Sequence, residues 1–508
     1  MPAAPAETEL KLQLDPKEVS RLKRSGVLAA ASRSEVDVEN TYYDTSNRLL
    51  HRHGMALRVR KIDGKWLQTL KTGGKGGALS QRGEWEAPAR VLRGRGRVDL
   101  PRLSASPLTK LFAAQKSRPV LQALFHTRFR RVRWLVGRDG SAIEVAIDIG
   151  EITASVGRET HRVPICEVEL ELKEGAPAAL IEVAIELIAP AGGAPLTLTP
   201  VSRSKAERGY QMIDQRPPAA VKASAKGFVE ELTRKTTTPR ALRAVVAHGL
   251  AVLTANSELL QQTNDPECVH QARVALRRVR SAIRLFDRDG RDLPKSLADE
   301  LHWMARVLGE ARDWDVITDE TLTSLVDGIG ANALRQLVAK AEQLRQRARE
   351  QLRAALQSPR YAMLVLGGEK WCMTPVPADK ELLGAAASPA LESGAKKMFK
   401  AARFFSALAP ERRHQVRILA KRLRYALDLF AVALPKASTT RYTDALSELQ
   451  DSLGQMNDAS VAVAVSPDLS PSRAIKKLMQ KWLLSIEPER VRDAEMKLLA
   501  LSKLQPPW

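Results

Sequence analysis

The chain has 508 residues, enough for two or three domains that each bury a core of their own. Its 80 lysines and arginines outnumber its 58 aspartates and glutamates, and the formal net charge of +22 predicts a polyanionic partner: nucleic acid, phosphates or an anionic membrane surface. The three cysteines, Cys166, Cys268 and Cys372, are too widely spaced for a metal-ligand pattern or a disulfide framework, which favours a reducing compartment. Neither an apolar signal segment nor a run of 18 apolar residues occurs, so we expect a cytoplasmic protein.

The first patterned segment is residues 6–14, A-E-T-E-L-K-L-Q-L. Alternate side chains of a strand share a face, so Glu7, Glu9 and Lys11 lie on one face and the leucines on the other. Two carboxylates this close repel each other unless a cation or several basic groups lie between them, and hard oxygen ligands favour Mg²⁺ or Mn²⁺. The segment is therefore either part of a divalent-metal site or an amphipathic strand with a solvated face.

Strand-like segments with charges of both signs continue to about residue 212. These segments lie at 55–61, 66–71, 80–86, 124–134, 143–149 and 165–173. Helices are predicted before and after them, at 16–31 and 177–188, and a further helical excursion near 90–118. Roughly eight short strands separated by turns predict a β-barrel or a β-sandwich. Two geometries stay open: the charged faces point outward around an apolar core, or they line a wet lumen that could hold a metal-bound polyphosphate.

Two details of this region concern phosphate binding. Residues 71–77, K-T-G-G-K-G-G, lack the G-x-x-x-x-G-K-[ST] spacing of a phosphate loop and are interpreted as a flexible turn between strands. In the segment 124–134, Arg131 and Arg133 share one face and Arg128 and Arg130 the other. The pattern does not decide which pair points inward.

The second half of the chain has a different period. Residues 213–227, rich in proline and alanine, predict a linker. At 228–505 apolar residues recur with the 3.6-residue period of helices, which predicts an all-α bundle.

This helical half also repeats itself. A basic segment at 268–280 returns at 413–425, and an L-G-x-x-x-D motif follows each of them. We therefore expect two copies of one helical unit, at about 228–370 and 390–505. The repeated basic residues are His270, Arg273, Arg277, Arg278 and Arg280, and then His414, Arg417, Lys421, Arg422 and Arg424. Two basic faces without interleaved acids are either solvated or bind a polyanion between them.

Other polar residues of the repeat have open roles. The aspartates of the L-G-x-x-x-D motifs, Asp313 and Asp458, either orient arginines or cap helices. The two histidines either contact phosphate or are core histidines. The second copy differs where Asn457 replaces Arg312, which weakens the assignment of Arg312 to binding.

The ordered motifs E-T-E-L-K, R-V-R, T-L-K, R-G-E-W-E, E-V-E-L-E-L-K and S-K-A-E-R-G-Y, spread over residues 5–212, resemble the CYTH domain of the triphosphate tunnel metalloenzyme family. The resemblance implies an eight-stranded antiparallel barrel that forms a tunnel with flanking helices, so the whole chain would be a multidomain α+β protein. It also implies metal-dependent hydrolysis of a triphosphate, or cyclisation at one.

The same resemblance implies roles for individual residues. Metal ligands would be Glu7, Glu9, Glu84, Asp148, Glu167, Glu169 and Glu171. Phosphate-binding residues would be Lys11, Arg58, Arg60, Lys71, Arg82, Arg131 and Arg133, and catalytic residues would be Glu7, Glu9, Lys11 and Lys205. One Mg²⁺ or Mn²⁺ would bridge phosphate oxygens, a second metal or the acidic wall would orient and deprotonate water, and the basic residues would neutralise the leaving pyrophosphate.

The pattern H-x-x-R-x-x-x-[RK]-R-x-R with its duplicated L-G-x-x-x-D resembles the CHAD domain over about residues 228–505. This resemblance implies an all-helical module with internal two-fold pseudosymmetry that binds inorganic polyphosphate. The ten repeated basic residues given above would be its polyphosphate-binding set.

The sequence therefore predicts an inorganic triphosphatase that cleaves tripolyphosphate to pyrophosphate and phosphate, joined to a polyphosphate-binding module. We expect no membrane or nucleic-acid partner, and a cytoplasmic location that could include polyphosphate granules. The alternatives are a nucleoside or thiamine triphosphatase or an adenylyl cyclase with the same tunnel, and a non-enzymatic polyphosphate- or nucleic-acid-binding scaffold.

Overall fold

The computed structural model describes residues 6–117, 119–190, 193–215, 218–323, 331–376, 381–464, 466–469 and 473–508. The chain divides into two compact units. The first comprises Met1–Val221, Leu250–Thr263 and Leu356–Met373, and the second comprises Lys222–Gly249, Asn264–Ala355 and Thr374–Trp508. Because the first unit takes in two segments of the helical half, the linear domain limits at 5–212, 213–227 and 228–505 stay predictions.

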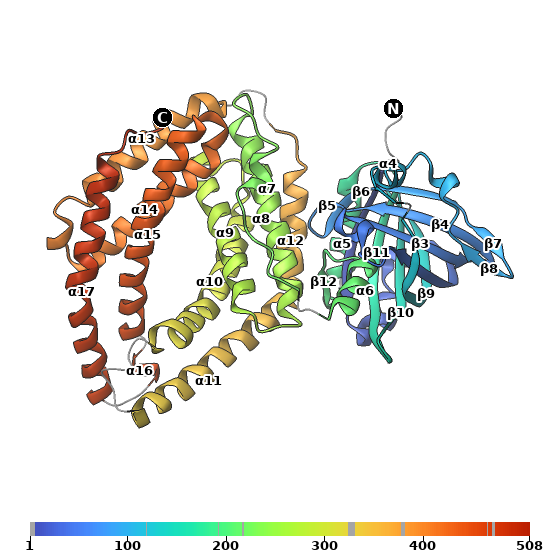
Figure 1. Ribbon diagram of the computed structural model, residues 1–508, viewed down its shortest axis with the longest axis horizontal. Coiled ribbons are helices and arrows are strands. Elements are labelled where there is room, and N and C mark those ends of the chain that lie inside the picture. Colours follow the sequence, from blue (N-terminus) through green and yellow to red (C-terminus); the bar gives the residue numbers. More distant parts are fainter. Residues whose placement is uncertain are drawn as a thin grey trace. The chain divides into compact units, whose positions relative to one another are not determined.

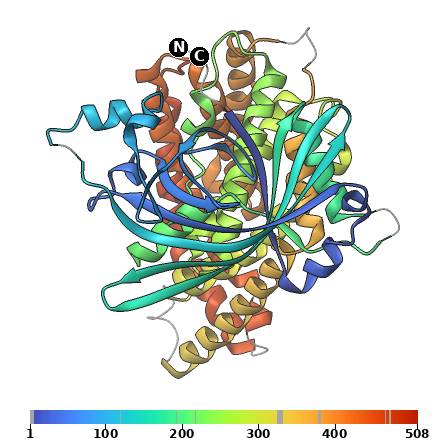
Figure 2. The same cartoon turned by 90° about the vertical axis from the view of Figure 1, so that its right-hand side faces the viewer.

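The first unit is built around a closed antiparallel barrel (Figures 1 and 2). Its wall consists of β1 (Ala6–Leu14), β2 (Ser32–Asp44), β3 (Met55–Ile62), β4 (Lys65–Thr72), β6 (Leu79–Pro88), β9 (Gln122–Arg138), β10 (Ser141–Val156) and β11 (Glu159–Glu174). The strands follow one another as β1-β11-β10-β9-β2-β3-β4-β6, and pairing of β6 with β1 closes the ring. The predicted eight-stranded barrel is confirmed.

Short elements surround the barrel. The strands are β12 (Leu198–Pro200), which pairs with β1, β5 (Lys75–Gly76), which pairs with β6, and a separate hairpin of β7 (Arg90–Leu92) and β8 (Arg95–Arg97). The helices are η1 (Pro16–Glu18), α1 (Val19–Leu22), α2 (Gly26–Ala29), α3 (Leu49–Arg52), η2 (Leu100–Leu103), α4 (Leu108–Ala113), α5 (Pro177–Ile188) and α6 (Lys205–Asp214). The single helix predicted at 16–31 is wrong: three short helical turns replace it, with a break at residues 23–25 that ends at Ser25 and Gly26, which are poor helix formers.

The apolar faces of the strands form a core outside the barrel. Leu10 and Leu12 of β1 and Val168 and Leu170 of β11 are fully buried. Helix α5 packs on β1, β10 and β11 and buries its own apolar face there. Because neighbouring side chains of a strand point to opposite faces, the charged residues between these apolar residues point into the lumen.

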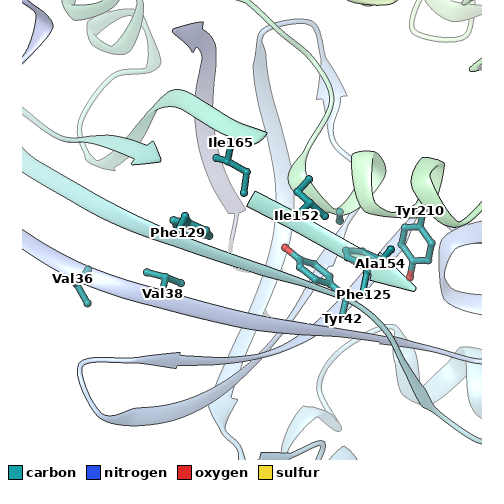
Figure 3. Close-up of a cluster of buried hydrophobic side chains, with 10 residues drawn as sticks. Val36, Val38, Tyr42, Phe125, Phe129, Ile152, Ala154, Ile165 and Tyr210 are labelled. Atoms are coloured by element: carbon teal, nitrogen blue, oxygen red, sulfur yellow. The ribbon is translucent and has the colours of Figure 1, made fainter. Parts of the chain in front are cut away.

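One end of the lumen is filled by apolar side chains (Figure 3). The buried cluster is Val36, Val38, Tyr42, Phe125, Phe129, Ile152, Ala154, Ile165, Ala206 and Tyr210. Helix α6 supplies the last two and packs on β9 and β10. The ring of Tyr42 stacks on that of Phe125, with centroids 4.5 Å apart, and Tyr210 meets Phe125 edge-on at 5.3 Å. Helix α6 thus closes this end of the barrel, and its first residue, Lys205, lies where the apolar end meets the charged part.

The remainder of the chain is helical. Its α-helices are α7 (Lys226–Val229), α8 (Thr238–Leu260), α9 (Pro266–Phe286), α10 (Lys295–Val316), α11 (Ala331–Leu356), α12 (Pro359–Cys372), α13 (Leu383–Ala401), α14 (Pro410–Phe430), α15 (Lys436–Ala464), α16 (Ser466–Leu469) and α17 (Arg473–Ser502), with short turns at η3 (Ile317–Thr321), η5 (Phe405–Ala407) and η6 (Ala431–Ala433). The predicted all-helical region is confirmed. Among the described helices, none combines the length and apolar character that crossing a membrane requires.

The two predicted basic segments form helices α9 and α14, each of 21 residues and each with a proline in its first turn. They pack against each other in the second unit, where the rings of Phe286 and Phe430 meet edge-on with centroids 5.6 Å apart. The internal two-fold repeat itself stays a prediction.

Candidate active site

A cavity of about 800 Å³ lies in the barrel and is lined largely by charged side chains. All seven predicted phosphate-binding residues line it: Lys11, Arg58, Arg60, Lys71, Arg82, Arg131 and Arg133. Of the predicted metal ligands, Glu7, Glu84, Glu169 and Glu171 line it as well. Of the two geometries that periodicity left open, the structure has the charged lumen.

Glu7 lies between two cations. Its carboxylate accepts hydrogen bonds from Lys71 Nζ at 2.6 Å and from Arg82 Nε at 2.9 Å. Burial alone would raise the pKa of Glu7, but the charges of Lys71 and Arg82 outweigh it and lower the pKa to about 2. Glu9, nearly fully buried, contacts Arg82 and Lys11. Both carboxylates of β1 are thus held in the lumen by cations from its wall.

The wall opposite is crowded with positive charge. Arg58 and Arg60 point into the lumen from β3, and the charge of Arg58 together with burial lowers the pKa of Arg60 to about 10. Burial and the charges of Arg82 and Arg58 also lower the pKa of Lys71. Glu84 offsets part of this charge, with Oε1 3.3 Å from Lys71 Nζ and 3.9 Å from Arg58 Nη2. A pKa lowered by like charges marks a site that an anion would stabilise.

Three carboxylates gather around Lys205. The ammonium lies 2.7 Å from Asp148 Oδ2 and 2.9 Å from Glu169 Oε1, and it also contacts Glu167. Burial opposes both charges, but the ion pairs raise the pKa of Lys205 and lower that of Glu169. Arg131 binds Asp148 with two hydrogen bonds of 2.7 Å. Asp148 and Glu167 are fully buried and do not line the cavity.

The orientation of β9 decides between the two arginine pairs. Arg131 and Arg133 line the cavity, whereas the side chains of Arg128 and Arg130 are 76% and 63% exposed. On the outer face Arg128 pairs with Glu39 at 2.7 Å. Glu35, Asp37 and Glu39 of β2 therefore lie on the outer surface, whereas the inner face of β2 carries apolar residues of the cluster at the α6 end. Asp44, the last residue of β2, is buried and accepts a hydrogen bond from Tyr210.

In the second unit, the basic residues of α9 lie close to one another and to Arg312 of α10. Arg273 Nη1 lies 3.2 Å from Asp313 Oδ1, so Asp313 contacts an arginine, one of its two expected roles. Burial and the charges of Arg312, Arg277 and Arg273 lower the pKa of His270. Arg280 Nη2 lies 2.8 Å from His302 Nε2. The helix thus presents a dense group of positive charges.

Helices α9 and α14 are joined by one arginine and also bring other arginines close together. Arg278 Nη2 lies 3.1 Å from Asp428 Oδ2, and its guanidinium lies 5.7 Å from the ring centroid of Tyr425. Arg278 therefore joins the two helices. Burial and the charge of Arg422 lower the pKa of Arg284, so positive charges also face each other across this helix pair.

On α14, His414 and Arg417 line a second cavity, of about 560 Å³, together with residues of α15 and α17. Arg424 Nη1 lies 3.4 Å from Gln450 Oε1. Lys421 and Arg422 belong to the same helix. Asn457 and Asp458 are in α15, but their side chains lie outside the described residues.

Comparison with known families assigns both halves of the chain. The model of the CYTH domain matches residues 5–205, and the model of the CHAD domain matches residues 244–465. The protein is a CYTH domain joined to a CHAD domain. The resemblance recognised from the ordered motifs is thereby confirmed.

Three individual relatives are similar to parts of the chain. The chain is 33% identical over 172 residues to "Inorganic triphosphatase" of Haemophilus influenzae. The matched residues make up 33% of this chain and 46% of that relative, so this chain spans about half the length of the relative. The crystal structure of the CHAD domain from the plant Ricinus communis is 30% identical, with a TM-score of 0.51, and covers 57% of this chain and 99% of its own. A "Putative adenylyl cyclase" from Hippeastrum, described as having a dominant triphosphatase activity, is 20% identical, with a TM-score of 0.26, and covers 40% of this chain and 96% of its own.

The carboxylates of the CYTH domain suit a hard divalent cation. Among the described residues, Asp148, Glu167 and Glu169 form one group of three carboxylates whose oxygen atoms lie within 4.8 Å of one another. Register places Glu9 and Glu144 on either side of Glu171, in a row across β1, β11 and β10. Burial raises the pKa of Glu171 although Lys173 Nζ lies 2.6 Å away. A half-buried carboxylate that a neighbouring lysine does not fully compensate fits the donor set of Mg²⁺ or Mn²⁺.

Sequence reasoning left out several residues that line the CYTH cavity, among them Glu86, Glu144 and Tyr42. The two glutamates had a signal, since each alternates along its strand with a chosen residue, Glu84 or Asp148. Tyr42, which accepts a hydrogen bond from Arg58, had none, because it is uncharged and the acids before it in its strand, Glu35, Asp37 and Glu39, lie on the outer face.

Proposed function

We propose that the protein is a metal-dependent inorganic triphosphatase that hydrolyses tripolyphosphate to pyrophosphate and phosphate. One observation carries the proposal: within a single cavity, crowded cations from β3, β4, β6 and β9 face carboxylates from β1 and β11. A triphosphate with its bound cation carries the complementary charges: its phosphate oxygens match the arginines and lysines, and its cation matches the carboxylates. The similarity to an inorganic triphosphatase over the matched residues supports this substrate class.

The cation would be held by carboxylates of the predicted set Glu7, Glu9, Glu84, Asp148, Glu167, Glu169 and Glu171. A bound Mg²⁺ or Mn²⁺ would supply charge neutralisation and Lewis acidity toward phosphoryl oxygens. Of the set, Glu7, Glu84, Glu169 and Glu171 have the most direct support, because they line the cavity and Glu171 is only partly compensated by Lys173.

The chain's own cations would bind the phosphate chain. Arg58 and Arg60 offer positive charge that Glu84 and Glu86 offset only in part, since the pKa of Arg60 stays lowered. Lys71 and Arg82 would exchange Glu7 for phosphate oxygens. The acidic wall at Glu169 and Glu171 would orient the attacking water, and Glu171, whose pKa burial raises, would accept its proton. Lys11, next to Glu9, and Lys205, bound to Glu169, would hold these acids in place and stabilise charge on the leaving pyrophosphate.

For the CHAD domain we propose binding of inorganic polyphosphate along α9 and α14. The support is the density of positive charge, which adds to the effect of burial in lowering the pKa of His270 and of Arg284. Arg278, engaged with Asp428, would act by holding the helices together, and the remaining basic residues of the predicted set would contact phosphate. Binding through phosphate groups weakens steeply with salt, by analogy with nucleic acid.

Release of phosphate from tripolyphosphate, ATP and long-chain polyphosphate, with and without Mg²⁺ or Mn²⁺, tests the enzymatic proposal. We expect the highest kcat/KM with tripolyphosphate and no turnover after chelation of the metal. A preference for ATP would replace the inorganic substrate by a nucleotide in the same tunnel. Protein inert toward every triphosphate from neutral to alkaline pH would leave a non-enzymatic scaffold.

A further inference from the structure

A buried glutamate from the CHAD sequence lies in the same compact unit as the barrel. Glu369 belongs to α12, which packs on α5 and β12 within the first unit. It is 7% exposed, and its Oε2 has no hydrogen-bond partner within the described parts of the chain. Such a group is costly to bury and calls for a reason.

Glu369 reaches the end of the glycine-rich turn. Its carboxylate accepts hydrogen bonds from the backbone N–H groups of Ala78 and Leu79. The approach is close at Gly77, where an added Cβ would lie 2.8 Å from Glu369 Oε1 and 3.2 Å from the Cα of Ala251 in α8. Residues 77–79 are thus held between two helices whose sequences lie far downstream of the barrel.

The segment that Glu369 holds begins β6, the strand that closes the barrel. Lys11 N donates to Ala78 O at 3.3 Å, and in the β1–β6 register Leu79 pairs with Leu10. Further along the same pair of strands, Arg82 lies opposite Glu7 and contacts both acids of β1. A shift of the β6 start would therefore move Arg82 relative to the carboxylates of β1.

We propose that Glu369 is a positioning residue for triphosphate hydrolysis: through the N–H groups of Ala78 and Leu79 it sets the register of β6 against β1 and so places Arg82 against Glu7 and Glu9. The inference rests on the proposed function for its catalytic consequence. In this arrangement a residue from the helical half of the chain helps to fix the β1–β6 pairing that closes the barrel.

Three variants of the full-length protein test the proposal, with K370A as a matched control from the exposed side of the same helix turn. E369L removes the acceptor, and E369Q keeps one acceptor oxygen. G77A places a methyl group against Glu369 Oε1 and the backbone of α8, so that the carboxylate and the turn must separate. We expect E369L and G77A to lower kcat/KM for tripolyphosphate by about 10²-fold, chiefly through KM, since a displaced binding group can cost that much. E369Q should stay within about tenfold of wild type, the worth of one hydrogen bond.

Hydrogen exchange of the backbone amides at 77–82 provides a readout that does not depend on turnover. Faster exchange there in E369L and G77A, with K370A unchanged in exchange and kinetics, supports the proposal. Wild-type kinetics in E369L, unchanged exchange at 77–82, or loss in E369Q equal to that in E369L would overturn it. If the wild type does not turn over tripolyphosphate, the proposed function fails separately. The exchange data still decide whether Glu369 stabilises the β1–β6 pairing.

Discussion

Lys71 holds the carboxylate of Glu7 with its ammonium, which lies 2.6 Å from both Oε1 and Oε2. The two residues come from β4 and β1, which lie on either side of β6 in the barrel. Because Lys71 and Arg82 keep the pKa of Glu7 near 2, Glu7 is ionised throughout the physiological range. The basic and acidic sides of the cavity thus neutralise each other, and a metal-bound triphosphate would replace these ion pairs by equivalent ones.

Substitution of Glu7 should therefore act in opposite directions on two measurements. E7Q removes a proposed metal ligand and should lower metal-dependent phosphate release by about 10²-fold or more. The same change removes one negative charge from beside Lys71 and Arg82, so metal-free tripolyphosphate should bind at least as tightly as in wild type by calorimetry. E39Q, on the outer face, serves as control. Weaker metal-free binding together with full turnover would contradict this role of Glu7.

Arg60 offers a way to separate binding from stability. Its pKa is lowered to about 10 chiefly by the charge of Arg58, so R60A should leave the ligand-free melting temperature unchanged or raise it. Tripolyphosphate should stabilise R60A less than wild type, with KM raised about 10-fold or more because a charge-assisted hydrogen bond is missing. R130A, from the exposed face of β9, should behave as wild type. Equal thermal shifts with ligand in R60A and wild type would remove Arg60 from the binding set.

Stability should depend on pH through Glu369. Burial raises its pKa from an ordinary 4.5 to about 8 against the opposing effect of two backbone N–H donors. The folded state therefore holds the proton more tightly than the unfolded chain, and this contribution to stability is complete below pH 4.5 and falls as pH rises toward 8. The loss would be at most about 1.4 kcal/mol per pH unit. Melting curves should show E369Q gaining on wild type from pH 5 to pH 8 and no further above it, whereas a constant difference would show that Glu369 does not titrate in this range.

The two domains should respond separately to charge reversal. R273E with R417E should weaken binding of long-chain polyphosphate and make it less dependent on salt, by about one unit of slope for each phosphate that the protein no longer neutralises. Turnover of tripolyphosphate should not change, because neither residue lines the barrel cavity. R128E with R130E reverses the same number of charges on the outer face of the barrel and is the matched control. An equal loss of both functions would argue against this division of labour.

Much of the barrel could be predicted from local patterns. The alternation in β1 and β11 reflects strands with one apolar and one charged face, and the ordered motifs identify the CYTH domain. Alternation is symmetric, however, so it could not decide which face points inward. That choice depends on α5, which covers the apolar face of β1, β10 and β11 and leaves the lumen to the charged one.

Residue choices within strands show the same limit. Arg131 and Arg133 could not be separated from Arg128 and Arg130 by sequence, because both pairs alternate equally well. The neighbouring strand decided it: β2 presents Glu39 outward to Arg128 and turns Val38 inward to the cluster under α6. Glu86 and Glu144 had a local signal in their alternation with Glu84 and Asp148. Only the folded sheet shows which residues lie beside them, as Glu171 lies beside Glu144.

The sequence by itself determined what each segment can be: amphipathic strands rich in both charges, basic helices, and the family of each half. Tertiary structure alone decided where those charges meet, because the β1–β6 closure joins residues that are distant along the chain and Glu369 arrives from a helix with no local signal of a role in the barrel. Side-chain type and period are local properties, whereas the electrostatics of a closed lumen arise from distances that only the folded chain creates.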